Sequence, residues 1–154
     1  VVTRFLETQN YEPHESVATL SNAMDVGAPS NFVRILEIFG NKFVDLKEKL
    51  ESVSISDGVT AQTMREVYKE TGYILDPHGA VGYRALADHL KTEPNSRGFF
   101  LETAHPVKFD SVREIIGTFG ATPPSVEELY SKQKVSTEMD NDYEALREVL
   151  LSKI

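Results

Sequence analysis

The sequence predicts an α/β fold with a mainly parallel sheet. Two short apolar runs, at residues 73–75 and 98–102, are each followed by a turn and then by a helical pattern. This alternation is typical of parallel sheets, because a parallel strand needs a long, usually helical crossover before the next strand can pair with it. A third strand-like stretch, at 53–55, alternates apolar residues with serines. We therefore expect helices packed on a sheet.

Helical periodicity characterises the first half of the chain. Pro29 and Ser30 suit the start of a helix, and Gly40-Asn41 predicts a break between this helix and a second one. The turn signal Asp57-Gly58 precedes a third helix, at about residues 60–71. The apolar residues that follow the helical period in these segments are Phe32, Ile35, Leu36, Phe39, Phe43, Leu46, Leu50, Met64, Val67 and Tyr68.

The second half contains three more helical patterns and a short helix. Asp76 and Pro77 form a helix start, because aspartate caps helices and proline is favoured in the first turn. A loop over 91–97 leads to the second strand and the helix behind it. Pro123-Pro124 starts a short helix, and a last helix covers about residues 142–152. The short helix extends through Leu129 and Tyr130. The apolar residues expected on the faces of the other three helices are Tyr83, Leu86, Ala87, Leu90, Phe109, Val112, Ile116, Phe119, Tyr143, Leu146 and Leu150.

Composition limits the partners of the chain. Its 154 residues suit one domain over residues 1–154, and its formal charge of −8 repels phosphate backbones and anionic lipid, so neither nucleic acid nor membrane is an expected partner. The absence of cysteine excludes disulfides, thiolate zinc sites and a cysteine nucleophile. No apolar run approaches the ~20 residues of a membrane span, and the first ten residues lack a signal-peptide pattern. We predict a cytoplasmic protein.

Two polar side chains directly follow the second strand. Ligands of open α/β folds bind at the carboxyl ends of strands, so Thr103 and His105 are placed for chemistry. The Thr103 hydroxyl can donate and accept a hydrogen bond, and the alternative interpretation is a turn or N-cap threonine. His105, followed by Pro106, is interpreted as a residue that supports the turn beside a ligand and does not carry protons. Lys108 is expected to be solvated.

Two further groups of polar residues are candidate binding sites. Asp76 and His78 have a spacing compatible with a metal pair, but without a His-x-x-x-His pattern or cysteine no metal site is predicted and helix capping is preferred. His78 is retained as a candidate substrate ligand. Ser30, Asn31 and Arg34 lie at a helix start, where free amides and the positive dipole end attract anions. Their alternative interpretation is two capping residues and a surface arginine.

Four motifs occur along the chain: Leu20-Ser21-Asn22-Ala23-Met24-Asp25-Val26-Gly27, Pro29-Ser30-Asn31-Phe32, Leu75-Asp76-Pro77-His78-Gly79-Ala80-Val81-Gly82-Tyr83 and Thr103-Ala104-His105-Pro106-Val107-Lys108-Phe109. Together they resemble the C-terminal portion of the bacterial threonine synthases, pyridoxal-phosphate enzymes of fold type II. The resemblance runs from residue 4 to at least residue 109 and corresponds to about the last third of a family member. It implies an incomplete part of a three-layer α/β/α fold.

The resemblance also implies a function. Family members use pyridoxal phosphate to convert O-phospho-L-homoserine and water to L-threonine and phosphate. In this pattern Thr103 matches the residue that hydrogen-bonds the pyridine nitrogen, with His105 beside the cofactor. The substrate phosphate makes Ser30, Asn31 and Arg34 candidate anion ligands. The family's cofactor-binding lysine and its phosphate-binding loop belong to segments upstream of this sequence. We therefore expect one wall of the site here, and no activity from the segment alone.

Two alternatives stay open at this point. Another enzyme of the same fold type, such as a relative of threonine deaminase or cysteine synthase, would share the fold. A non-catalytic interaction module would have kept the fold without the lysine motif. The first residue, Val1, suits a processed chain, an internal fragment or a cleavage product. A sheet cut at its edge would also invite self-association through exposed strands.

Overall fold

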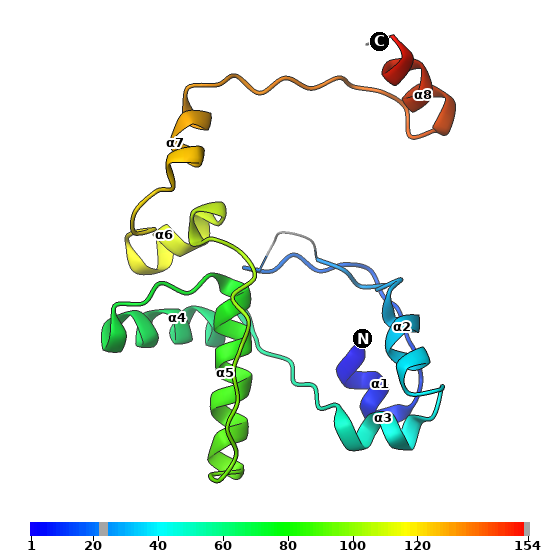
Figure 1. Ribbon diagram of the computed structural model, residues 1–154, viewed down its shortest axis with the longest axis vertical. Coiled ribbons are helices and arrows are strands. Elements are labelled where there is room, and N and C mark those ends of the chain that lie inside the picture. Colours follow the sequence, from blue (N-terminus) through cyan, green and yellow to red (C-terminus); the bar gives the residue numbers. More distant parts are fainter. Residues whose placement is uncertain (22–24, 153–154) are drawn as a thin grey trace. The chain divides into compact units, whose positions relative to one another are not determined.

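The computed structural model describes residues 1–21 and 25–152 (Figure 1). Asn22, Ala23 and Met24 of the first family motif lie outside the described residues. Helices connected by extended segments make up the described part of the chain. They are α1 (Val2–Thr8), α2 (Phe32–Ile38), α3 (Phe43–Lys49), α4 (Asp57–Thr71), α5 (Pro77–Thr92), the 3₁₀-helix η1 (Pro106–Lys108), α6 (Asp110–Ile116), α7 (Pro124–Tyr130) and α8 (Tyr143–Leu151).

The predicted α/β fold, with three α/β/α layers and a mainly parallel sheet, is wrong for residues 1–21 and 25–152, because none of these residues forms a strand. The three segments expected as strands, 53–55, 73–75 and 98–102, are non-helical but unpaired. A strand exists only when its backbone groups bond to a neighbouring strand. The alternation of apolar residues indicates which side of an extended segment is buried, and it does not show that a partner strand is present.

The chain divides into two compact units, Val1–Gly120 and Ala121–Ile154. The first unit contains two separate hydrophobic clusters. The first of these, here called the α4–α6 core, lies where α4, α5 and α6 pack together, and α4 contacts both of the other helices. Figure 1 shows α4 and α5 running in different directions from their common region. The buried residues of this core are Met64, Val67, Leu75, Ala80, Phe109 and Val112.

The second cluster of this unit, here called the α1–α3 core, is formed by Phe5, Leu6, Phe32 and Leu46. Its aromatic rings meet edge to face, with ring centroids 4.9 Å apart for Phe5 and Phe32 and 5.5 Å apart for Phe5 and Phe43. Such contacts add to the free energy gained from burying the rings. Helix α1 was not predicted, because its seven residues carry only a short apolar run.

Local signals explain where most helices begin and end. Gly40 and Asn41 both have positive φ angles, 56° and 60°, which confirms the predicted break between α2 and α3. The Asp76 cap of α5 is confirmed as well. The turn predicted at Asp57-Gly58 is wrong: these residues form the first turn of α4, since the Ser56 hydroxyl caps this helix by accepting a hydrogen bond from the Val59 amide.

The second unit contains α7 and α8. Asp142 caps α8 by accepting a 2.9 Å hydrogen bond from the Ala145 amide, and the predicted helix positions are confirmed. The buried face expected on α8 is not observed, because Tyr143 is 73% exposed and Leu150 57%. Helical periodicity indicates which face is apolar, but burial needs a partner surface as well. Across the described helices, none is long and apolar enough to cross a membrane.

Candidate functional site

The Thr103–His105 turn follows the extended segment 98–102, as the sequence analysis expected. Both side chains are exposed, whereas Ala104 between them is half-buried against the α4–α6 core. His105 is the N-cap of η1: its Nδ1 accepts a hydrogen bond from the Val107 amide at 3.2 Å. The Thr103 hydroxyl makes no hydrogen bond to any described residue and is therefore free to bind a ligand atom.

Asp76 lies at the N-terminus of α5 and is completely buried. Its Oδ1 accepts a hydrogen bond from the His78 amide at 2.8 Å, and the His78 ring Nδ1 lies 2.8 Å from the same oxygen. The His78 ring also packs edge to face on Phe109, with 5.4 Å between ring centroids. These contacts give His78 a structural role at the helix start, and about one third of its side chain remains exposed.

Glu102 directly precedes Thr103 and connects the turn to α5. Its Oε1 accepts a 2.7 Å hydrogen bond from the Asp76 amide. The pKa of Glu102 is raised to about 7: burial is the main cause and the nearby Asp76 carboxylate adds to it, while the hydrogen bond from the Asp76 amide acts in the opposite direction. Glu102 was not among the predicted site residues. In the structure, Phe100 and Glu102 are half-buried while Phe99 and Leu101 are exposed, a difference that the apolar run Gly98-Phe99-Phe100-Leu101 does not show.

The predicted anion ligands lie elsewhere in the same unit. Ser30, Asn31 and Arg34 are all exposed, and Asn31 is the N-cap of α2 without a capping hydrogen bond from its side chain. Arg34 forms no ion pair with another described residue. Within residues 1–21 and 25–152, no hydrogen bond joins these three residues to Thr103, His105 or His78.

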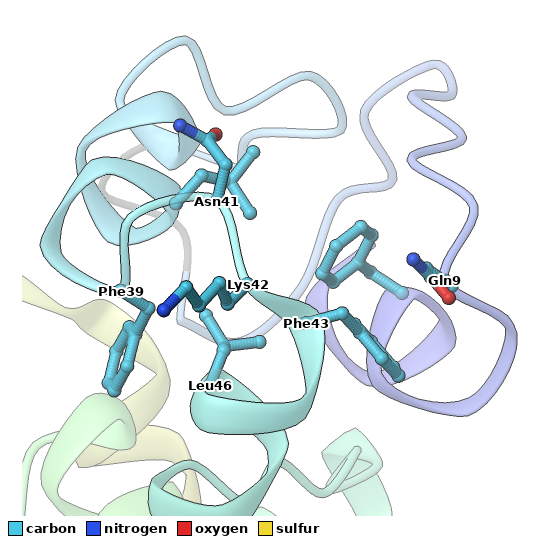
Figure 2. Close-up of a pocket in the computed structure, with 8 residues that line it drawn as sticks. Gln9, Phe39, Asn41, Lys42, Phe43 and Leu46 are labelled. Carbon is cyan, nitrogen blue, oxygen red and sulfur yellow. The ribbon is translucent and has the colours of Figure 1, made fainter.

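A separate pocket opens in the α1–α3 core, with a volume of about 160 Å³ (Figure 2). Its lining is largely apolar, with the amides of Gln9 and Asn41 and the ammonium group of Lys42 as the polar contributions. It contains none of the residues predicted as ligands. Among the residues that the structure describes, no group of three or more histidine, cysteine, aspartate or glutamate side chains is arranged to hold a metal ion.

Comparison with known proteins gives consistent results. Residues 79–150 match the family model "Threonine synthase, C-terminal". The chain is 43% identical to the threonine synthase of Escherichia coli strain K12 over 152 residues, and 41% identical to that of Buchnera aphidicola subsp. Schizaphis graminum over 153 residues. These alignments cover 98% and 99% of the chain but 35% of each relative. The chain thus spans about a third of the length of these curated relatives.

Two solved structures are similar to the chain. The crystal structure of threonine synthase from Escherichia coli aligns with 99% of the chain and 35% of its own length, at a TM-score of 0.85 and 43% identity. The crystal structure of threonine synthase from Brucella melitensis, solved with pyridoxal phosphate bound, aligns with 97% of the chain and 37% of its own length, at a TM-score of 0.64 and 25% identity.

Proposed function

Since this chain belongs to the threonine synthase family and corresponds to the C-terminal segment of its members, we propose that it forms one wall of a threonine synthase active site. The reaction proposed is the conversion of O-phospho-L-homoserine and water to L-threonine and phosphate. The observation that carries this proposal is the 43% identity over 98% of the chain, together with a TM-score of 0.85.

The proposed cofactor is pyridoxal phosphate, which the Brucella melitensis relative binds. The residues of this chain fit one edge of such a cofactor, because the exposed Thr103 hydroxyl has no partner among the described residues and can bond a ring nitrogen. When bound, the cofactor supplies an electron sink for carbanion chemistry. A hydroxyl is too weak an acid to protonate the ring nitrogen, so Thr103 orients the ring without charging it. His105 supports the turn by capping η1.

The proposed ligands of the substrate phosphate are Ser30, Asn31 and Arg34. In support, all three are exposed and the Arg34 guanidinium is not engaged by a described carboxylate. Guanidinium groups bind phosphate in a bidentate manner, which suits this role. His78 is proposed as a positioning residue, because its ring is bonded to Asp76.

The proposed setting is the cytoplasm, which the absence of cysteine supports, since disulfides are rare there. The predicted self-association through strand edges rested on a sheet that residues 1–21 and 25–152 do not form. Exposed strand edges therefore give no support to self-association of this chain.

Replacement of Thr103 tests the cofactor contact in a full-length threonine synthase that carries this segment. We expect Thr103→Ala to lower kcat by roughly 5- to 150-fold, the equivalent of one hydrogen bond of about 1–3 kcal/mol. The absorbance of the bound cofactor should change too. Thr103→Ser keeps the hydroxyl and should retain both properties, and Thr92→Ala, on the exposed end of α5, is the matched control. Unchanged absorbance and turnover in Thr103→Ala would exclude the contact.

Substrate choice separates the proposed enzyme from its relatives of the same fold type. The same full-length protein is assayed with O-phospho-L-homoserine, threonine and O-acetylserine. We expect turnover with the phosphate ester. Turnover of threonine or O-acetylserine alone would point to a deaminase or a cysteine synthase relative, and no turnover of any of them would favour a non-catalytic module.

A further inference from the structure

Oδ2 of Asp76 and Oε2 of Glu102 are buried carboxyl oxygens without a hydrogen-bond partner among the residues that the structure describes. An unsatisfied buried oxygen costs free energy, because the water that it loses is not replaced. Both atoms belong to the region where the segment 98–102 meets the start of α5. Their common location indicates that one missing partner serves both.

The other oxygen of each carboxyl group is satisfied. Asp76 Oδ1 accepts from the His78 amide and lies within hydrogen-bonding distance of the His78 ring, while Glu102 Oε1 accepts from the Asp76 amide. The Glu102 and Asp76 side chains are themselves within hydrogen-bonding reach. Two carboxylates cannot bond each other, since neither has a donor. A single proton between them would satisfy both orphaned oxygens.

We propose that Glu102 and Asp76 form a buried acid pair that shares one proton, with Glu102 Oε2–H donating a hydrogen bond to Asp76 Oδ2. Asp76 is the ionised member, because its Oδ1 accepts from the His78 amide and it lies at the positive end of the sixteen-residue helix α5. A metal ion is a poorer occupant, because no metal-binding group of three or more ligands exists in the described part of the chain.

The surroundings of the pair explain why the proton is held. Burial is the largest influence on Glu102, and Asp76 is the charged group that raises its pKa. The other titratable group in contact with the pair is His78, which is bonded to Asp76. The helices that pack on α5 and on the turn contribute buried side chains without charge, such as Thr63 and Met64 of α4 and Val112 of α6.

Close packing keeps the Glu102 carboxyl group in place. It occupies the space in which a Cβ atom at Gly79, in the first turn of α5, would lie. Thr103 is the next residue in the chain, so loss of the shared proton places two negative charges directly before the turn. Glu102 is therefore a positioning residue for Thr103. The effect of Glu102 on cofactor binding through Thr103 rests on the proposed function. The shared proton does not rest on it.

Carbon NMR of the glutamate δ-carbons tests the pair in the 154-residue chain without cofactor. We expect the Glu102 signal to titrate with a midpoint near 7, and the Thr103 methyl signal to follow the same midpoint. In Asp76→Asn the new amide can donate to Glu102, so the midpoint should fall towards the ordinary value of 4.5. The exposed Glu114, on α6, is the internal control. A Glu102 midpoint near 4.5 in the unaltered chain would overturn the proposal, whatever the outcome of the activity assays.

Stability against pH gives a second, independent measurement. The folded state holds the Glu102 proton more tightly than the unfolded state, so this group stabilises the fold fully below about pH 4.5 and its contribution is lost as the pH rises to about 7. Glu102→Gln places a permanent donor opposite Asp76 and should abolish this decline, whereas Glu114→Gln should not. An identical decline in Glu102→Gln would contradict the shared proton.

Discussion

The two cores of the first unit are stabilised in different ways. In the α4–α6 core, side chains cap three of the four helix starts: Ser56 caps α4, Asp76 caps α5 and His105 caps η1, whereas the N-cap of α6, Phe109, makes no capping hydrogen bond. In the α1–α3 core the N-cap residues, Val1, Asn31 and Lys42, make no capping hydrogen bond through their side chains. That core depends instead on aromatic rings, including Tyr11, which stacks on Phe32 with 5.2 Å between centroids.

The difference determines how each core responds to its surroundings. A core of rings is stabilised by burial and dispersion, which depend little on pH. The α4–α6 core adjoins a buried carboxyl pair, so protons act on it directly. The candidate cofactor residue Thr103 lies beside the α4–α6 core, which responds to pH. The candidate phosphate ligands lie at the start of α2, in the α1–α3 core.

The largest expected effect comes from truncating one buried leucine in each core. Leu75 and Leu46 are each 1% exposed, so Leu75→Ala and Leu46→Ala should each cost about 2–5 kcal/mol of stability. The two cores share no buried residue. Hydrogen exchange should therefore show the greater loss of protection in α4–α6 for Leu75→Ala and in α1–α3 for Leu46→Ala. Equal losses in all helices from both variants would mean that the two cores unfold as one.

A smaller effect is expected from removing the caps. Ser56→Ala deletes the cap of α4 and should lower the free energy of unfolding by about 0.5–2 kcal/mol. Asn31→Ala, its counterpart in the aromatic core, removes no capping bond and should cost less than about 0.5 kcal/mol. Urea denaturation of the two variants measures the difference. If Asn31→Ala were the more damaging, the contrast between capped and uncapped helices would not hold.

The smallest effect concerns a cation beside the aromatic core. The Lys47 ammonium group lies 5.8 Å from the centre of the Phe43 ring. Lys47→Gln should cost about 0.5–1 kcal/mol, the usual worth of an exposed cation–π contact. Lys49→Gln, on the same helix, is the control and should be close to neutral. Thermal denaturation of both variants, at low and at high salt, measures their loss of stability. Only Lys47→Gln should show the loss that we assign to this contact.

Helices were predictable and the sheet was not, for a physical reason. The bonds of an α-helix are local, so the spacing of Phe32, Ile35 and Leu36 and the cap at Asp76 were enough to predict α2 and α5. The pairing of a strand depends on residues that its own sequence does not specify, so the segment 98–102 was misread as a strand of a sheet.

The candidate site was predictable only in part. The motif around Thr103 and His105 identified the family, and the family model and the relatives confirm it. The assigned roles of these residues remain predictions. Glu102 was missed because nothing in a single sequence shows that its carboxyl group meets that of Asp76, twenty-six positions away.

The lack of a side chain at Gly79 has a consequence for protein engineering. Because the Glu102 carboxyl group fills the volume above Gly79, the two positions are expected to tolerate change jointly and not singly. In a library that varies position 79 alone, each larger residue would have to displace the Glu102 carboxyl group. A library that pairs a larger residue at position 79 with a smaller one at position 102 would keep the local volume constant. Such variants would lack the Glu102 carboxyl group, so this group would no longer make the stability of the junction depend on pH.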